Sequence, residues 1–267
     1  MKWLPVDCCV GNLDILAEII HKNRYLFSEA EHKLKIAYCT YISMEGSTEI
    51  LPIKLSNEQI DFLRRAYSSR AKKYRLDWID RLYMNKLLSC PMCGGEGPRT
   101  IDHYLPKEWY PEFAVLSYNL IPSCGTCNSK RGSYNHPQQP HPVLHPYFDA
   151  DILSALIIYI DLSITTNVPN FTLMFNSYAF SPINQNRVAA HIRTCVDMTA
   201  FRSKCYGFMT EYRIAEKYND QNHLNSYLSM RLEILEHGGN QNCWESALIR
   251  GIRRKPAVAA QIIAMMK

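Results

Sequence analysis

Two Cys-x-x-Cys pairs, Cys90–Cys93 and Cys124–Cys127, constrain this chain more than any other feature, and 30 residues separate them. Four thiolates at this spacing can close a tetrahedral shell around Zn²⁺, with Zn–S distances of about 2.3 Å. A shell of four protein ligands leaves no position for water, so such a zinc would be structural and would fix the intervening loop. The alternatives are four unligated cysteines or a redox pair, but a redox pair favours a βαβ context, which this segment lacks.

The remaining cysteines and the apolar stretches indicate a reduced, cytoplasmic protein. A chain of 267 residues folds without disulfide staples. We therefore expect the other cysteines to be reduced and most of them to be small core residues. Pro5 and Asp7 break the start of the chain before an apolar run develops, and the apolar stretch 152–164 is too short to span a bilayer. The sequence predicts cytoplasmic localisation and no membrane association. The cysteines outside the two pairs are Cys8, Cys9, Cys39, Cys195, Cys205 and Cys243.

The cysteine-rich segment divides the chain into three predicted parts. Residues 1–89 are predicted to be helical: apolar positions recur at helical spacing over 12–45, and Ser56 with Gln59 forms a capping-box signature. Residues 90–150 lose this periodicity and concentrate Gly, Pro, Cys and His, so they need a metal or their neighbours to hold them. Residues 151–267 read as a β-hairpin followed by helices. We expect an α+β fold that is mainly helical.

The last part has more detailed expectations. Two stretches rich in β-branched and aromatic residues, 156–165 and 171–180, predict a hairpin around a turn with Asn167, Pro169 and Asn170. A single long helix is predicted from Ser181-Pro182 to about residue 218. Further helices are predicted at 222–237, 244–250 and 256–266.

Polar residues inside and just after the cysteine loop follow a specific order. Asp102-His103 lies within the loop, and Asn119 comes shortly before the second cysteine pair. Asn128 directly follows Cys127, and Lys130 and Arg131 come after it. This ordered combination, over residues 90–132, resembles the HNH (ββα-metal) endonucleases in the form whose last motif position is Asn. The resemblance implies a small zinc-stapled ββα-metal module at 90–150 with helical additions on both sides.

The residue types suit phosphodiester cleavage. His103, with an ordinary pKa near 6.5, can take a proton from water as a general base. Asp102 offers the hard oxygen that Mg²⁺ or Mn²⁺ prefers. Neighbouring side chains of a strand point to opposite faces, so both residues serve one site only if the backbone bends there. The resemblance implies that Asn128 completes the catalytic metal site and that Asn119 braces the loop carrying His103. It also implies that Lys130 and Arg131, with Lys107 as a weaker candidate, face the phosphates.

Charge and flanking motifs bear on partners. A net charge of +5 leans mildly toward an anionic partner. The Leu-Pro-Lys after Asp102-His103 and the later run from His145 to Asp149 are similar to nucleases of Septu-type anti-phage systems, which pair such a nuclease with an ATPase. The run at His145 is either a further phosphate contact or a loop that packs aromatics over the zinc module. Two basic runs, 64–75 and 250–255, are either solvated helix faces or backbone-binding surfaces.

The function predicted from these features is metal-dependent cleavage of nucleic acid. DNA is the first substrate class, and RNA, tRNA included, is the second. The nuclease would work in complex with an ATPase or alone. The contrasting hypothesis is a zinc-stabilised module that binds nucleic acid or protein without catalysis.

Overall fold

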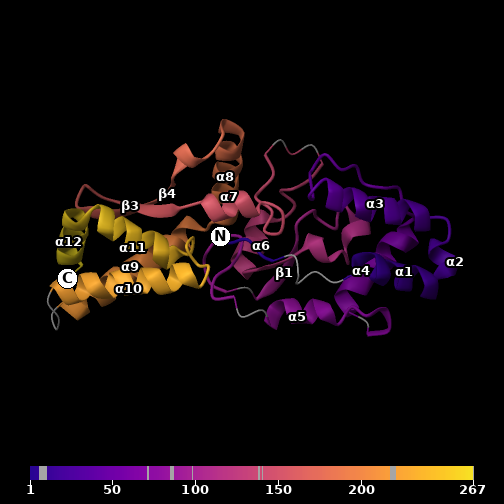
Figure 1. Ribbon diagram of the computed structural model, residues 1–267, viewed down its shortest axis with the longest axis horizontal. Helices are drawn as coiled ribbons and strands as arrows, with labels where there is room; N and C mark the ends of the chain where they lie inside the picture. Colours follow the sequence, from indigo (N-terminus) through magenta and orange to yellow (C-terminus); the bar gives the residue numbers. More distant parts are fainter. Residues whose placement is uncertain are drawn as a thin grey trace.

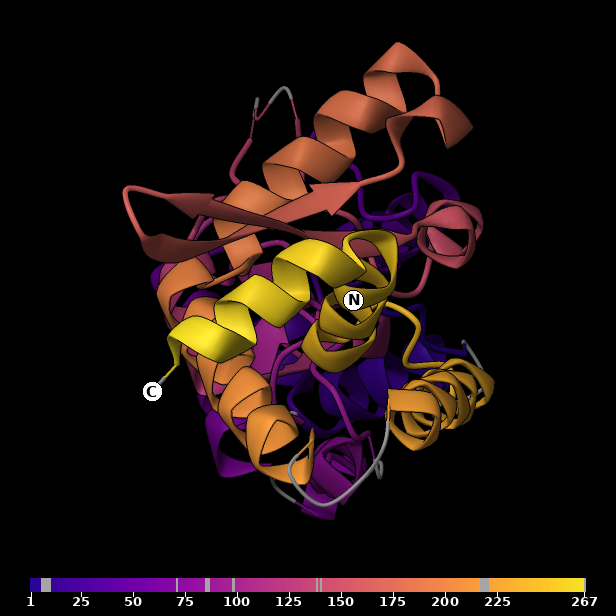
Figure 2. The same cartoon turned by 90° about the vertical axis from the view of Figure 1, so that its left-hand side faces the viewer.

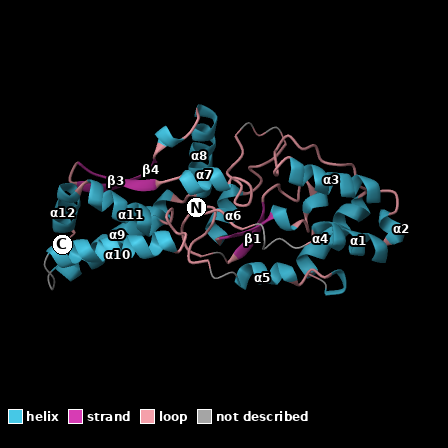
Figure 3. Ribbon diagram, in the orientation of Figure 1, coloured by secondary structure: helices cyan, strands magenta, loops and turns pink. Residues whose placement is uncertain are grey.

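A computed structural model describes residues 1–5, 11–70, 72–84, 87–97, 99–137, 139, 141–216 and 221–266. The fold is α+β, with helices predominating and, in the described residues, two antiparallel two-stranded sheets (Figure 3). The N-terminal helices lie at one end of an elongated molecule and the C-terminal helices at the other, with β1 and α6 between them (Figure 1). Among these residues, no helix combines the length and the apolar character needed to cross a bilayer.

The N-terminal part is helical, as the sequence predicts. Ser56 accepts a hydrogen bond from the Gln59 backbone and the Gln59 side chain returns one, which confirms the capping box at the start of α4. The predicted helical region 12–45 is divided by turns into three helices. The elements are α1 (Asn12–Lys22), α2 (Arg24–Phe27), α3 (Glu31–Ser43), α4 (Asn57–Ser69), η2 (Lys72–Tyr74) and α5 (Trp78–Met84).

The middle of the chain contains a short hairpin followed by a helix. Strand β1 (Thr100–His103) pairs antiparallel with β2 (Leu120–Ser123), and α6 (Gly125–Arg131) follows and packs on β1. The connection between the strands holds two 3₁₀ turns, η3 (Pro111–Phe113) and η4 (Ser117–Asn119).

The C-terminal part contains the predicted hairpin. Strands β3 (Ile158–Thr165) and β4 (Val168–Phe175) pair in register, and α11 packs against β3 (Figure 2). At Gly251 in α11, an added Cβ would lie 2.2 Å from the carbonyl oxygen of Ile160, so this approach requires glycine. The other elements are α7 (Ala150–Ala155), η5 (Ser177–Ala179), α8 (Pro182–Cys195), α9 (Met198–Glu216), α10 (Gln221–His237), α11 (Trp244–Arg254) and α12 (Pro256–Met265).

Two details of this part differ from the sequence prediction. The hairpin turn is Thr166-Asn167, both with positive φ, and Pro169 lies inside β4. The Pro169 carbonyl faces away from β3 and accepts a hydrogen bond from Tyr206, so the missing N–H costs no pairing. The predicted single helix is also wrong: α8 ends at Cys195, and Asp197 accepts hydrogen bonds from the Thr199 and Ala200 N–H groups in the first turn of α9.

Candidate metal centre and the Asp102–His103 hairpin

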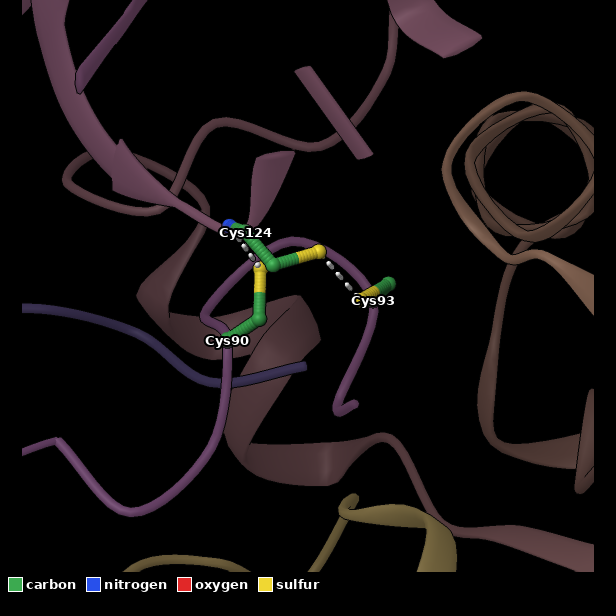
Figure 4. A group of neighbouring side chains, drawn as sticks. All are labelled: Cys90, Cys93 and Cys124. Atoms are coloured by element: carbon green, nitrogen blue, oxygen red, sulfur yellow. Dashed lines mark hydrogen bonds between the residues drawn. The ribbon is translucent and has the colours of Figure 1, made fainter. Parts of the chain in front are cut away.

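Three of the four paired cysteines bring their sulfur atoms together. The Sγ atoms of Cys90, Cys93 and Cys124 lie within 4.8 Å of one another, and those of Cys93 and Cys124 are 3.6 Å apart (Figure 4). Thiolates that share a tetrahedral Zn²⁺ lie about 3.8 Å apart, as follows from Zn–S bonds of about 2.3 Å. The cluster could therefore hold a metal ion.

Backbone N–H groups surround these sulfurs. Cys124 N–H points at the sulfur of Cys90, Gly95 N–H at that of Cys93, and Cys127 N–H at that of Cys124, each over 3.3 Å. Such bonds favour thiolates, the form that binds metal. Gly94 has φ +71° and an added Cβ would lie 2.2 Å from the Asn242 carbonyl oxygen, so the tight turn of the first pair requires glycine.

Cys127 lies buried in the first turn of α6, but its sulfur is not within 4.8 Å of all three others, so the structure brings together three of the four predicted zinc ligands. Burial raises the pKa of the Cys195 thiol, but its contacts with Cys127 and His191 lower this pKa to about 5 overall. His191 lies one turn before Cys195 on α8 and its Nε2 is 2.5 Å from the Met92 carbonyl oxygen, so α8 holds the first cysteine pair in place.

Asp102 faces α6, where Arg131 neutralises it. Its Oδ2 is 2.7 Å from Arg131 Nε, and both side chains are buried. Arg131 also donates to the carbonyls of His103 and Tyr104. Burial alone would lower the pKa of Arg131, but Asp102 raises it, so the guanidinium stays charged.

From the sequence we expect Arg131 to face a phosphate, but in the structure its guanidinium faces Asp102. Arg131 is three residues after Asn128, on the face of α6 that packs against β1. Lys130 donates to the Val196 carbonyl at the end of α8, and Lys107 pairs with Glu108 over 3.2 Å. The three predicted phosphate contacts therefore all have protein partners.

Asn128 lies on the same side of β1 as Asp102. Its Nδ2 donates to Thr100 Oγ1 over 3.3 Å. Among the described residues, nothing donates a hydrogen bond to Asn128 Oδ1 or to Asp102 Oδ1. Each side chain therefore keeps one oxygen that could bind a cation, and carboxylate and amide oxygens of this kind fit Mg²⁺ or Mn²⁺.

His103, the last residue of β1, contacts other elements. Its ring lies 4.4 Å from that of Tyr67 in α4, and its Nε2 is 3.0 Å from the Ala114 carbonyl oxygen. A carbonyl only accepts, so Nε2 carries the proton and Nδ1 is the unprotonated nitrogen. Burial lowers the pKa of His103 to about 3, which keeps the ring neutral.

Asp102 and His103 thus leave β1 in different directions. The strand pairs regularly through Asp102↔Ile121 and His103↔Leu120, without the bend that would turn both side chains to one face. The amide of Asn119 holds the connection that follows: Leu105 N–H donates to its Oδ1 over 2.7 Å, and its Nδ2 donates to the carbonyls of Leu105 and Phe113.

Comparisons with known proteins cover parts of the chain. It is 40% identical over 77 residues to Protein ea31 of Escherichia phage lambda, covering 28% of this chain and 26% of that protein. It is 33% identical over 104 residues to Septu protein PtuB of Bacillus thuringiensis, covering 37% of this chain and 40% of that protein. The chain therefore spans less than half the length of either relative. No family model and no solved structure matches it.

The flanking motifs are engaged in packing. His145 and Tyr147 are buried, and the His145 ring lies 3.9 Å from that of Tyr104, so this run packs aromatics beside the hairpin. In the second basic run, Lys255 pairs with Asp161 over 2.6 Å and Arg254 lies over the Tyr159 ring, so these cations bind β3. Arg64 of the first run donates to the Lys107 carbonyl.

Sequence reasoning missed several residues around the site. His191 and Cys195 are spaced i,i+4 on one helix, a pattern that could have marked them as a pair facing the cysteine cluster. Tyr41 was also missed. The run at His145 was singled out, but its contact with Tyr41 was not predicted, because no local pattern links residues so far apart.

Proposed function

We propose that this chain is a metal-dependent HNH (ββα-metal) endonuclease that hydrolyses phosphodiester bonds, with the nuclease module at 90–150 and helical additions at 1–89 and 151–267. The observation that carries the proposal is the state of His103. Its Nε2–H is bound to the Ala114 carbonyl, so the ring is oriented and Nδ1 is free to accept a proton. The order of β1, β2 and α6 around the cysteine cluster supports the same class.

The chain's own residues would divide the work. As a water oxygen bonds to phosphorus, its proton passes to His103 Nδ1, the P–O bond to the sugar oxygen breaks, and that oxygen takes a proton from solvent. The substrate phosphate would lie at the end of β1. Because Asp102 and His103 leave this strand in different directions, both would serve one phosphate only after the end of the strand bends on binding. Lys107 and Lys130 would contact phosphates only after leaving their present partners.

Two kinds of ion complete the proposal. Zn²⁺ held by Cys90, Cys93, Cys124 and Cys127 would be structural. Mg²⁺ or Mn²⁺ held by the free oxygens of Asp102 and Asn128 would act as a Lewis acid on the phosphate.

The similarity to Septu protein PtuB supports a role in anti-phage defence. The proposed partner is an ATPase, as the resemblance of the motifs to Septu-type nucleases implies. DNA is the proposed substrate, and RNA, including tRNA, is the alternative. The net charge of +5 suits either.

A second function is favoured by the ion pair between Asp102 and Arg131. A carboxylate already neutralised by a buried guanidinium attracts a divalent cation less strongly, which suits a zinc-stabilised module that binds nucleic acid or protein without cutting.

Cleavage assays with metal removed and restored test the proposal. Plasmid DNA, single-stranded DNA and tRNA are incubated with the protein, alone and co-expressed with an ATPase partner, in EDTA and then in Mg²⁺ or Mn²⁺. The proposal expects cation-dependent cleavage of at least one substrate and its loss in Asn128→Ala. Binding without cleavage under all these conditions would support the second function.

A further inference from the structure

Three buried side chains from distant parts of the chain form a hydrogen-bonded series beside the hairpin. Tyr41, in α3, has its hydroxyl 3.0 Å from Asn119 Oδ1 and 3.1 Å from His145 Nε2. All three residues are at most 1% exposed. The series therefore joins the N-terminal helices, the hairpin connection and the loop at His145, away from water.

The donor and acceptor of each hydrogen bond follow from the backbone groups at the two ends of the series, because a backbone N–H can only donate and a carbonyl can only accept. The Tyr147 N–H can only donate, and it points at His145 Nδ1 over 3.2 Å. His145 therefore carries its proton on Nε2 and donates it to the Tyr41 hydroxyl oxygen. Burial lowers the pKa of His145 well below its ordinary value, which keeps the ring neutral. The Tyr41 hydroxyl then donates its one proton toward Asn119 Oδ1 at 3.0 Å, which is nearer than its other acceptor, the Tyr118 carbonyl oxygen at 3.3 Å.

The Asn119 amide has one possible orientation. Leu105 N–H requires an acceptor and the Phe113 carbonyl requires a donor, so Oδ1 faces the first and Nδ2 the second. Leu105 lies two residues after His103, and Phe113 directly precedes Ala114. The amide thus holds both ends of the segment whose Ala114 carbonyl binds His103 Nε2.

We propose that Tyr41 and His145 are positioning residues for His103, acting through Asn119 and the 105–114 segment to keep Nδ1 as the free nitrogen. The effect of this positioning on catalysis rests on the proposed function of His103 as general base. The effect on the orientation and tautomer of the His103 ring does not rest on that function. One measurement therefore tests catalysis and a second tests the ring.

The test must distinguish hydrogen bonding from packing, because the Tyr41 ring also lies 4.9 Å from that of Phe113. Tyr41→Phe removes the hydroxyl and keeps the ring. Tyr38→Phe is the matched control: Tyr38 is in the same helix and equally buried, its ring lies 6.2 Å from that of Phe113, and its hydroxyl has no hydrogen-bond partner within the described part of the chain. At His145, His145→Leu removes the donor and His145→Gln restores one.

The first measurement is cleavage kinetics of the full chain in Mn²⁺. We expect Tyr41→Phe and His145→Leu to lower kcat about tenfold with KM unchanged, because a misplaced His103 ring accepts the proton less well in the transition state while substrate binding is unaffected. Tyr38→Phe and His145→Gln should stay within about twofold of wild type. An unchanged kcat in Tyr41→Phe, or an equal loss in Tyr38→Phe, would overturn the positioning role.

The second measurement is ¹⁵N NMR of the His103 ring, which needs no activity. Wild type should show protonated Nε2 and unprotonated Nδ1, and Tyr41→Phe should show a mixture of tautomers. If wild type cleaves nothing, the proposed function fails while this spectrum still decides the positioning role. An identical His103 spectrum in wild type and Tyr41→Phe would refute it. If Tyr41→Phe does not fold, the comparison of His145→Leu with His145→Gln gives the same decision.

Discussion

The Nε of Arg131 lies 2.7 Å from Oδ2 of Asp102, and this buried ion pair joins α6 to β1. The pair uses one oxygen of the carboxylate, while Oδ1 accepts no hydrogen bond from the described residues. A carboxylate held in this way is oriented and still able to bind a cation through its second oxygen.

Removing Arg131 should destabilise the fold strongly. Arg131→Met leaves Asp102 charged, buried and unpaired, and such a change costs about 3–5 kcal/mol. Urea unfolding at pH 7.5 measures it. Lys130→Met, next to it on the exposed side of α6, should cost less than about 1 kcal/mol. Equal stability of Arg131→Met and wild type would mean that the ion pair does not form in solution.

The cysteine cluster should bind about one zinc per chain. We expect Cys90→Ser to lose most of this metal and to melt well below wild type, because binding of a structural zinc contributes directly to folding. Metal analysis after gel filtration, with a thermal melt, checks both. Cys39→Ser changes an exposed thiol outside the cluster and should keep wild-type metal content. Full zinc content in Cys90→Ser would contradict the site.

Glu112 should make stability depend on pH. Burial raises the pKa of its carboxyl from 4.5 to about 7. Oε1 accepts a hydrogen bond from Ile53 N–H, and none of the residues that the structure describes donates one to Oε2. Between pH 4.5 and 7 the folded state binds more protons than the unfolded state, so this group stabilises the fold as the pH falls and destabilises it as the pH rises through 7.

Glu112→Gln should therefore stabilise the protein by up to about 3 kcal/mol at pH 8 and by little at pH 4.5. Urea unfolding of both proteins at each pH gives the difference in the free energy of unfolding. Burial lowers the pKa of His145, so this residue changes stability with pH in the opposite direction. Both proteins contain His145, so its contribution cancels in the difference. A difference between variant and wild type that is the same at pH 8 and pH 4.5 would show that Glu112 titrates normally.

Local patterns were sufficient to predict much of the secondary structure. The capping box at Ser56 and the hairpin of β3 and β4 depend on neighbouring residues, so the sequence indicates them directly. The break between α8 and α9 was missed because apolar residues continue across it. Only the cap that Asp197 gives to the Thr199 and Ala200 N–H groups marks the start of a second helix.

At the site, residue types were easier to predict than directions. The cysteines, Asp102 and Asn119 were singled out by their order in the chain. Whether Arg131 points to solvent or to Asp102 depends on how α6 packs on β1, which no local pattern encodes. The series through Tyr41 and His145 joins residues 78 and 104 positions apart and exists only in the folded chain.

The central claim is that His103 is a general base, and single-turnover cleavage by His103→Ala tests it most directly. The substrate is whichever nucleic acid wild type cuts in Mg²⁺ or Mn²⁺, and His136→Ala, an exposed histidine, is the control. We expect His103→Ala to be slower by about 10²–10⁴-fold and His136→Ala to match wild type. Cleavage by His103→Ala at the wild-type rate would contradict the account.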